Sequence, residues 1–423
     1  MLDIIKLIRF GGFMKDRVDI KQYIGNNAIK IKDGVTNGIT SKMLIKEKNR
    51  VYFFKENENM DNTDLHNDIA EVFSIYFFKK IGYDKYVDYK LVKIGNTEGV
   101  LSPSFISEDV VAERNFATLL TLYTYMNKYK KNYSIDKVFS EEQIKKVLIG
   151  MSFVVKKGDY CNSIEFISDV LSYVCDKCHV FLDCEKLINN LVELAILDYF
   201  ITNADRHVFN LTFLIKRDKK DGRLYCELSP TFDQGCAFGV RQYWRKISKN
   251  MIPKYEKRFN PAIAMTKKSQ ICSVGDKGYY SDEVFEGGGS LVCDLIKYIS
   301  DKPNLLSFFE RCKSVNIKEV IEEFNANEPA KIDAQLASYI VATFNSRLEK
   351  VEEIEYYMKN NDNKKRVANS FKKQKENQIT IEKLLNLCNK NKPLFVDVNN
   401  SCKLKNAVVN VKNFAQNKKC GMN

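Results

Sequence analysis

The 423-residue sequence predicts an α+β fold in which a small antiparallel sheet with one helix is followed by a mainly helical region. Short segments of alternating polarity, separated by glycines, run from about residue 16 to residue 55. Helical spacing of apolar residues follows in LHNDIAEVFSIYFFKKIG and again in LINNLVELAILDYF. With 44% hydrophobic and 12% aromatic residues, the chain can bury a large core.

The first hundred residues are interpreted as mostly strands. The segments KQYIG, AIKIKDG, SKMLIKEKNR and VYFFKEN are predicted to form the sheet, and YVDYKLVKIG with EGVLSPSFI a further strand pair. The helix between them is expected to stop at Gly82, a residue type typical of helix ends. We therefore predict a sheet lobe over residues 1–110, a helical lobe over residues 111–360 and a tail over residues 361–423.

The composition predicts a soluble protein of the cytoplasm. No apolar run reaches the roughly 18 residues that a membrane span requires, and the charged start MLDIIKLIRFGGF does not resemble an export signal. Secretion without a signal peptide stays open. The 12 cysteines are expected to be reduced thiols. One cluster offers zinc ligands, but its helical spacing favours core thiols; its members are Cys175, Cys178, His179 and Cys184.

The formal net charge of +13 is concentrated in the tail. Residues 361–423 hold 14 Lys and Arg against four Asp and Glu, so the remainder is almost neutral. A basic tail suits an acidic partner or nucleic acid, although such tails are more often simply solvated.

A polar cluster follows the second helical segment, in the stretch ITNADRHVFN. The turn sequence DKKDG between two strand-like runs predicts a hairpin that returns Asp233 to this cluster. Phosphoryl transfer from ATP needs Mg²⁺ held by oxygen ligands and an acceptor hydroxyl aligned with the phosphate. Asn210 and Asp233 suit the metal, and Asp205 suits the role of base.

Two further groups of residues are candidates for nucleotide binding. Lys55 ends a predicted strand and could hold phosphates, paired with Glu71 in the following helix. The turn DGVTNGITSK offers backbone amides that could cradle phosphate; the residues are Gly38, Ile39, Thr40 and Ser41. Taken alone, Lys55 and Glu71 would more often be solvated surface charges, and the turn could be an ordinary hairpin.

These motifs, in this order, resemble the HipA-like kinases. The family signature N-x-D-R-H-x-x-N matches Asn203, Asp205, Arg206, His207 and Asn210, and P-x-F-D-x-G follows from Pro230 to Gly235. The resemblance covers about residues 20–355, and 338–351 are similar to the family's last core helix. It implies a two-lobed protein-kinase-like fold and a serine/threonine protein kinase that uses ATP and Mg²⁺ on a protein substrate. It also implies an adenine-binding hinge at Ser104, Phe105 and Ile106, and a structural place near the phosphates for His207.

Two other functions remain open, a kinase of small molecules or lipids and an inactive nucleotide-binding adaptor. Lipid kinases share a similar D-R-H-x-x-N loop, and the loop does not specify the acceptor. We also expect autophosphorylation between Cys236 and Ser290, a segment that follows Asp233 as an activation loop does. Its candidate hydroxyls are Ser248, Thr266, Ser269, Ser273 and Ser281.

Overall fold

The computed structural model describes residues 17–24, 29–33, 42–60, 63–155, 164–203, 205–254, 292, 295–296 and 298–359. The predicted phosphate turn from Gly38 to Ser41 and the basic tail lie outside these residues. Within them, no helix combines the length and the apolar character needed to cross a membrane.

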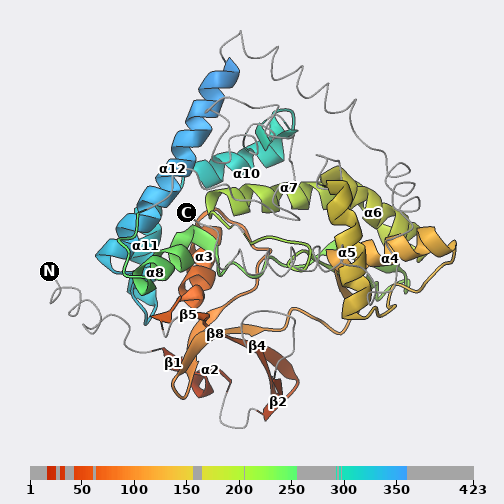
Figure 1. Ribbon diagram of the computed structural model, residues 1–423, viewed down its shortest axis with the longest axis horizontal. Coiled ribbons are helices and arrows are strands. Elements are labelled where there is room, and N and C mark those ends of the chain that lie inside the picture. Colours follow the sequence, from red (N-terminus) through yellow and green to blue (C-terminus); the bar gives the residue numbers. More distant parts are fainter. Residues whose placement is uncertain are drawn as a thin grey trace, which may run out of the picture.

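A six-stranded sheet forms the first lobe, which lies below the helices in Figure 1. All neighbouring strands are antiparallel except the first pair in the sheet order, which is parallel. The order is β1 (Val18–Asp19), β7 (Lys90–Ile94), β8 (Thr97–Pro103), β4 (Arg50–Glu56), β3 (Lys42–Glu47) and β2 (Ile29–Asp33). The predicted segments from AIKIKDG onward are therefore confirmed as strands.

The expectation that KQYIG is a strand is wrong, because Lys21–Ile24 forms the short helix α2. The amide of Ile24 donates to the carbonyl of Ile20 at 3.1 Å, and both side chains pack into the sheet core. Two apolar residues four positions apart lie on one face of a helix and equally on one face of a strand, so this spacing fits both structures. So short a run does not distinguish the two periods.

The long helix of the first lobe is α3 (Asn67–Lys80), which ends before Gly82 as predicted, with Gly82 at a φ of 67°. It is buried along most of its length because it also packs on the second lobe. The Phe73 ring meets the Phe238 ring edge-on at 4.7 Å, and Phe77 meets Phe344 at 5.9 Å. Figure 1 shows α3 beside α8 and α11.

The second lobe is mainly helical, as expected, and also holds a four-stranded sheet. The order in this sheet is β10 (Val180–Leu182), β12 (Leu224–Leu228), β11 (Thr212–Arg217) and β9 (Val110–Asn115). A two-stranded sheet, β5 (Asn59–Met60) and β6 (Thr63–Asp64), precedes α3. The helices are α4 (Phe116–Tyr129), α5 (Glu141–Val155), α6 (Ile164–Lys177), α7 (Cys184–Phe200), α8 (Val240–Ser248), α10 (Pro303–Lys313), α11 (Ile317–Asn327) and α12 (Ala334–Lys359), with the 3₁₀ turn η2 (Ala237–Gly239).

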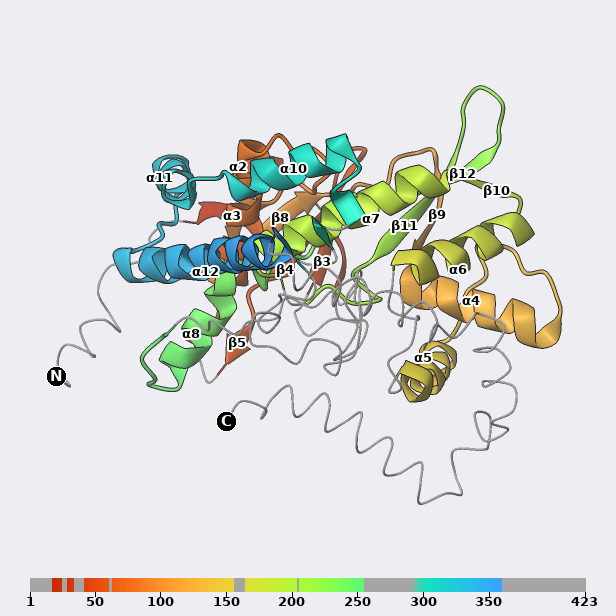
Figure 2. The same ribbon diagram turned by 90° about the horizontal axis from the view of Figure 1, so that it is seen from above.

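The predicted hairpin around DKKDG is confirmed. Strands β11 and β12 are antiparallel, and Gly222 adopts a φ of 72° in the turn between them. The hairpin projects at one end of the helical lobe in Figure 2. Ser229, just after β12, donates its amide to the carbonyl of Thr212 at 3.0 Å, so the chain returns to the start of β11 before it reaches Asp233.

Candidate active site

Lys55 joins the two lobes through a pair of carboxylates. It lies on β4, where it pairs with Lys42 of β3 and Val100 of β8. Its Nζ donates to Glu71 Oε1 at 2.7 Å and to Asp233 Oδ1 at 2.5 Å. Burial would lower the pKa of Lys55, but the two carboxylates outweigh burial and raise this pKa well above its ordinary value. Lys55 is therefore a fixed positive charge at the junction of sheet, helix and D-Q-G segment.

Helix α3 also holds the segment that follows Asp233. The second oxygen of Glu71, Oε2, accepts the amide of Gln234 at 2.6 Å, and Asn67 donates from Nδ2 to the carbonyl of Gly235 at 3.1 Å. A Cβ on Gly235 would lie 3.3 Å from both Asn67 Cβ and Glu71 Oε1, closer than most side-chain contacts. The glycine of this motif thus lets the backbone approach the helix.

The loop after α7 is braced by a buried ion pair. Asp198 accepts from Arg206 Nε at 3.0 Å and Nη2 at 3.2 Å, and from Asn203 Nδ2 at 2.9 Å. The same guanidinium donates from Nη1 to the carbonyls of Asn210 at 3.2 Å and Phe232 at 2.7 Å. Arg206 therefore ties the loop to the residue before Asp233. Asp198 was not predicted from the sequence, although an acid inside the apolar stretch LAILDYF was a usable signal.

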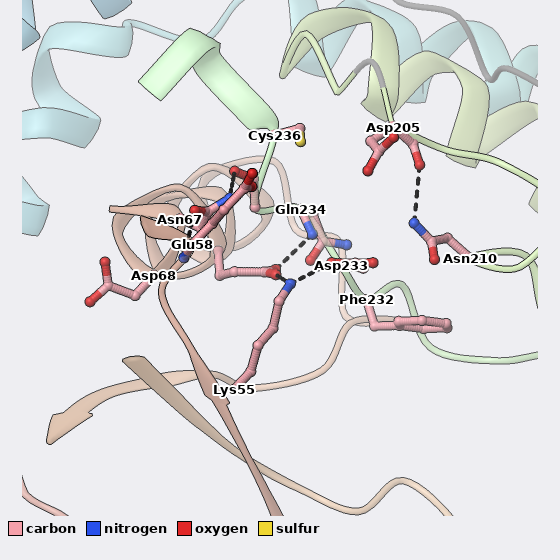
Figure 3. A network of polar contacts seen from close by, with 12 residues as sticks. Lys55, Glu58, Asn67, Asp68, Asp205, Asn210, Phe232, Asp233, Gln234 and Cys236 are labelled. Atoms are coloured by element: carbon pink, nitrogen blue, oxygen red, sulfur yellow. Dashed lines mark hydrogen bonds and ion pairs between the residues drawn. The ribbon is translucent and has the colours of Figure 1, made fainter. Parts of the chain in front are cut away.

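The three residues assigned to catalysis and metal binding come together, as Figure 3 shows. Asp205 and Asn210 lie on one side of Asp233, and Lys55 lies on the other. The Asn210 side chain donates from Nδ2 to the backbone carbonyl of Asp205 at 3.0 Å, while the Asp205 amide donates to Asn203 Oδ1 at 3.3 Å. These contacts fix the loop, and neither of them uses the carboxamide oxygen of Asn210.

His207 is held within the loop itself. Its Nδ1 accepts the amide of Phe209 at 3.3 Å, and the two rings meet edge-on at 5.9 Å. This contact suits a structural role. A contact with phosphate remains a prediction for His207.

The predicted hinge connects β8 of one sheet to β9 of the other. Ser104 donates its amide to Val51 at 2.8 Å and accepts the amide of Ile106 on Oγ at 3.2 Å. The Phe105 ring stacks on Phe232, with centroids 5.8 Å apart and planes at 25°. Because Phe232 precedes Asp233, this stack places an aromatic surface between the hinge and the D-Q-G segment.

The thiols that could have bound zinc make other contacts. Cys178 donates from Sγ to the carbonyl of Tyr133 at 3.3 Å, and burial raises its pKa to about 11, so it stays a thiol. Cys175 is buried in the core, whereas Cys184 is exposed at the start of α7 and contacts Ser172. The core interpretation fits Cys175 and half-buried Cys178, but not Cys184.

No family model matches the sequence, and no curated protein matches it either. Solved structures with a similar course of the chain include the Helicobacter pylori proinflammatory kinase CtkA, at 15% identity and a TM-score of 0.47 over 80% of this chain and 97% of that one. A chain from the Shewanella oneidensis MR-1 toxin–antitoxin complex of HipA, HipB and operator DNA has 12% identity and a TM-score of 0.35, covering 83% of this chain and 70% of that chain.

A third similar structure is spectinomycin phosphotransferase APH(9)-Ia with ADP and spectinomycin, at 11% identity and a TM-score of 0.19 over 87% of this chain and 93% of that one. Similarity this remote says nothing about activity, which has to follow from the side chains of the site.

Proposed function

We propose that the protein is a HipA-like, ATP-dependent serine/threonine kinase that transfers the γ-phosphate to a hydroxyl group of a protein. The observation that carries this proposal is the contact of Lys55 with both Glu71 and Asp233. In protein kinases a strand lysine pairs with a helix glutamate, and the aspartate of the D-x-G motif binds the metal. Asp205 and Asn210 complete the same set on the other side of Asp233.

Each side chain has a defined task in this proposal. The Lys55 ammonium neutralises α- and β-phosphate charge, and Glu71 keeps the ammonium on the nucleotide side of β4. Asp205 orients the acceptor hydroxyl and accepts its proton as the bond to phosphorus forms. Phe105 and Phe232 offer an apolar surface to adenine beside the hinge.

The donor set at Asn210 and Asp233 fits Mg²⁺. One carboxamide oxygen and one carboxylate are hard ligands, and Mg²⁺ usually combines one or two such groups with phosphate oxygens and water. When bound, the ion would neutralise charge on the transferring phosphate. Arg206 holds the carbonyls of Asn210 and Phe232, so it positions both ligands without contributing one.

The direct test is incubation of the purified full chain with γ-labelled ATP and Mg²⁺, alone, with a protein lysate, and with lipid and small-molecule acceptors. Label on proteins, lost in Asp205→Asn, supports a protein kinase. Label on lipids or small molecules but not on proteins would instead indicate a kinase of small molecules or lipids. ATP binding without any transfer would leave only a nucleotide-binding adaptor.

Two parts of the proposal concern segments largely outside the described residues. Autophosphorylation is proposed between Cys236 and Ser290, and mass spectrometry beside Asp205→Asn tests it. Of the candidates, Ser248 lies at the end of α8, where its Oγ donates to the carbonyl of Arg245 at 2.9 Å. Removal of residues 361–423 is expected to spare transfer and to weaken binding to acidic partners, measured as salt-dependent retention on heparin.

A further inference from the structure

A second cluster of titratable side chains lies at the start of α3, apart from the proposed Mg²⁺ ligands. Asp64 ends β6, His66 is the residue before α3, and Glu98 lies on β8. Each offers one ligand atom, and the three atoms lie within 4.8 Å of one another. Neither the phosphate chemistry nor the hinge uses these residues.

The imidazole of His66 is the least expected member of this cluster. Its Nδ1 is enclosed by protein and has no hydrogen-bond partner, while the side chain as a whole is 12% exposed. The nearest carboxylate oxygen, Asp64 Oδ1, is 3.6 Å away, which is too far for a hydrogen bond. A buried nitrogen without a partner costs free energy unless something else binds it.

The backbone and a neighbouring ring hold the imidazole in this position. His66 has a left-handed φ of 49°, which is uncommon for residues other than glycine, and its amide donates to Asp64 Oδ1 at 2.7 Å. The ring of Trp244, in α8, contacts the His66 ring with centroids 4.6 Å apart. The ring is thus fixed beside the carboxylates.

The charges around His66 are unbalanced toward negative. Three carboxylates, of Asp64, Asp68 and Glu98, meet one guanidinium, that of Arg17, among the described residues in contact. Arg17 is bonded to Asp68 at 2.8 Å and reaches Glu98 at 3.7 Å, and its charge also acts on Asp64. Farther away, Lys93 acts on Glu98. The positive end of α3 and Arg17 oppose a cation here, but the carboxylates outnumber them.

We propose that Asp64, His66 and Glu98 form a binding site for one divalent transition-metal ion of the Zn²⁺ type, separate from the nucleotide's Mg²⁺. One imidazole nitrogen and two carboxylate oxygens form a ligand set that zinc accepts with water in a remaining position. Mg²⁺ and Ca²⁺ prefer oxygen ligands throughout, so they compete poorly at His66. The bound ion would join β8 to the start of α3, the helix that carries Asn67 and Glu71.

The chain provides its own optical probe for this site. Trp244 is the single tryptophan of the sequence, and it contacts His66 directly. The full-length protein is first freed of metal by chelation. Zn²⁺ is then added without nucleotide or Mg²⁺ while tryptophan emission is recorded. The expected result is a saturable change in emission that is complete at one equivalent.

Two variants and one matched control locate the ion. His66→Asn removes the imidazole and keeps a residue that tolerates the left-handed backbone, and Glu98→Gln removes one carboxylate at a partly exposed side chain. Each is expected to weaken Zn²⁺ binding at least about tenfold, since loss of even a supporting residue costs about 10–100-fold. His179→Asn is the control, because His179 is also left-handed, at a φ of 56°, but exposed.

Each outcome decides the matter. An unchanged emission on addition of Zn²⁺, or an equal response in His66→Asn, overturns the site. If both His66→Asn and Glu98→Gln retain Zn²⁺ on dialysis with the affinity of the parent, the cysteines bind the ion. That outcome also overturns the site. Each variant is interpreted only if its circular dichroism matches that of the parent. If His66→Asn fails to fold, Glu98→Gln still tests the site.

Discussion

The six-stranded sheet and the helical body are packed in different ways. The buried core confined to the sheet is small and consists of Ile20, Ile24, Ile45, Phe54, Val92 and Leu101. The body is built around a continuous core that runs from α3 to α12. Although α3 lies among the sheet strands in sequence, its aromatic face belongs to the larger core.

This difference shows which side chain of the proposed site depends on the junction between the lobes. Asp233 lies on the body, and Glu71 lies on α3, which packs on the body and binds the amide of Gln234 through Glu71. Lys55 alone of the three comes from the sheet. Its position relative to the body depends on its two ion pairs and on the packing of α3 against β7 and β8. Arg241, which donates to Glu58 just after β4, adds support.

The largest expected effect comes from the body side of the junction. Asp233→Asn is expected to lower phosphate transfer about 10³-fold or more, because the metal loses its charged ligand. Asparagine is chosen because Asp233 has a left-handed φ of 63°, which asparagine tolerates. Label transfer from ATP is the measurement, and a normal melting curve is the control. Parental turnover in the folded variant would remove Asp233 from the site.

Next in size is the packing of α3 on the body. Phe77→Ala is expected to cost about 3–5 kcal/mol of unfolding free energy, because a fully buried ring is lost between Phe238 and Phe344. Phe54→Ala is the matched variant in the sheet core. Hydrogen exchange should quicken in β3, β4 and β8 for Phe54→Ala and throughout the body for Phe77→Ala. Identical exchange patterns would contradict the division into two cores.

Loss of the group that bridges the junction should have an intermediate effect. Lys55→Met is expected to reduce phosphate transfer about 10²-fold, because the phosphates lose a fixed charge. The substitution also leaves Glu71, whose side chain is wholly buried, without its ammonium partner.

The same variant should show a change in pH dependence. Burial raises the pKa of Glu71 above 4.5, and Lys55 opposes this rise. Without Lys55 the folded state keeps the proton of Glu71 over a wider range than the unfolded chain does, so stability falls as pH rises through that range. The melting temperature of Lys55→Met should therefore lie further below that of the parent at pH 8 than at pH 5. A difference that is equal at both pH values would show that Glu71 keeps its charge without Lys55.

The smallest expected effect concerns the ion pair beside the junction. Arg241 Nε and Nη2 each donate to Glu58 at 2.7 Å, with side chains 26% and 19% exposed. Arg241→Lys cannot make both bonds and is expected to cost about 0.5–1 kcal/mol. Chemical unfolding gives the value, and Lys80→Met, which removes an exposed partner of Glu319, is the control. A cost no greater than that of the control would show that this pair does not support the junction.

Local sequence determined the elements whose pattern is long or whose turn is specific. The helical spacing from Ile69 to Phe77 predicted α3, and DKKDG predicted the β11–β12 hairpin, because periodicity and turn chemistry act between near neighbours. The same hairpin predicted that Asp233 returns to the loop of Asp205 and Asn210. Where the apolar run was short, as in KQYIG, the period was ambiguous and the strand prediction failed.

Tertiary structure alone decided the contacts between residues far apart in the chain. Nothing in the sequence indicated that α3 packs on α11 and α12 or that Trp244 lies against His66. Asp198 stood out only as an acid in an apolar stretch, and its pairing with Arg206 was not predictable. Such pairings follow from which buried surfaces and charges find complementary partners once the elements assemble. Each costs free energy if left unmatched, so the whole fold selects them, and no window of neighbouring residues contains that information.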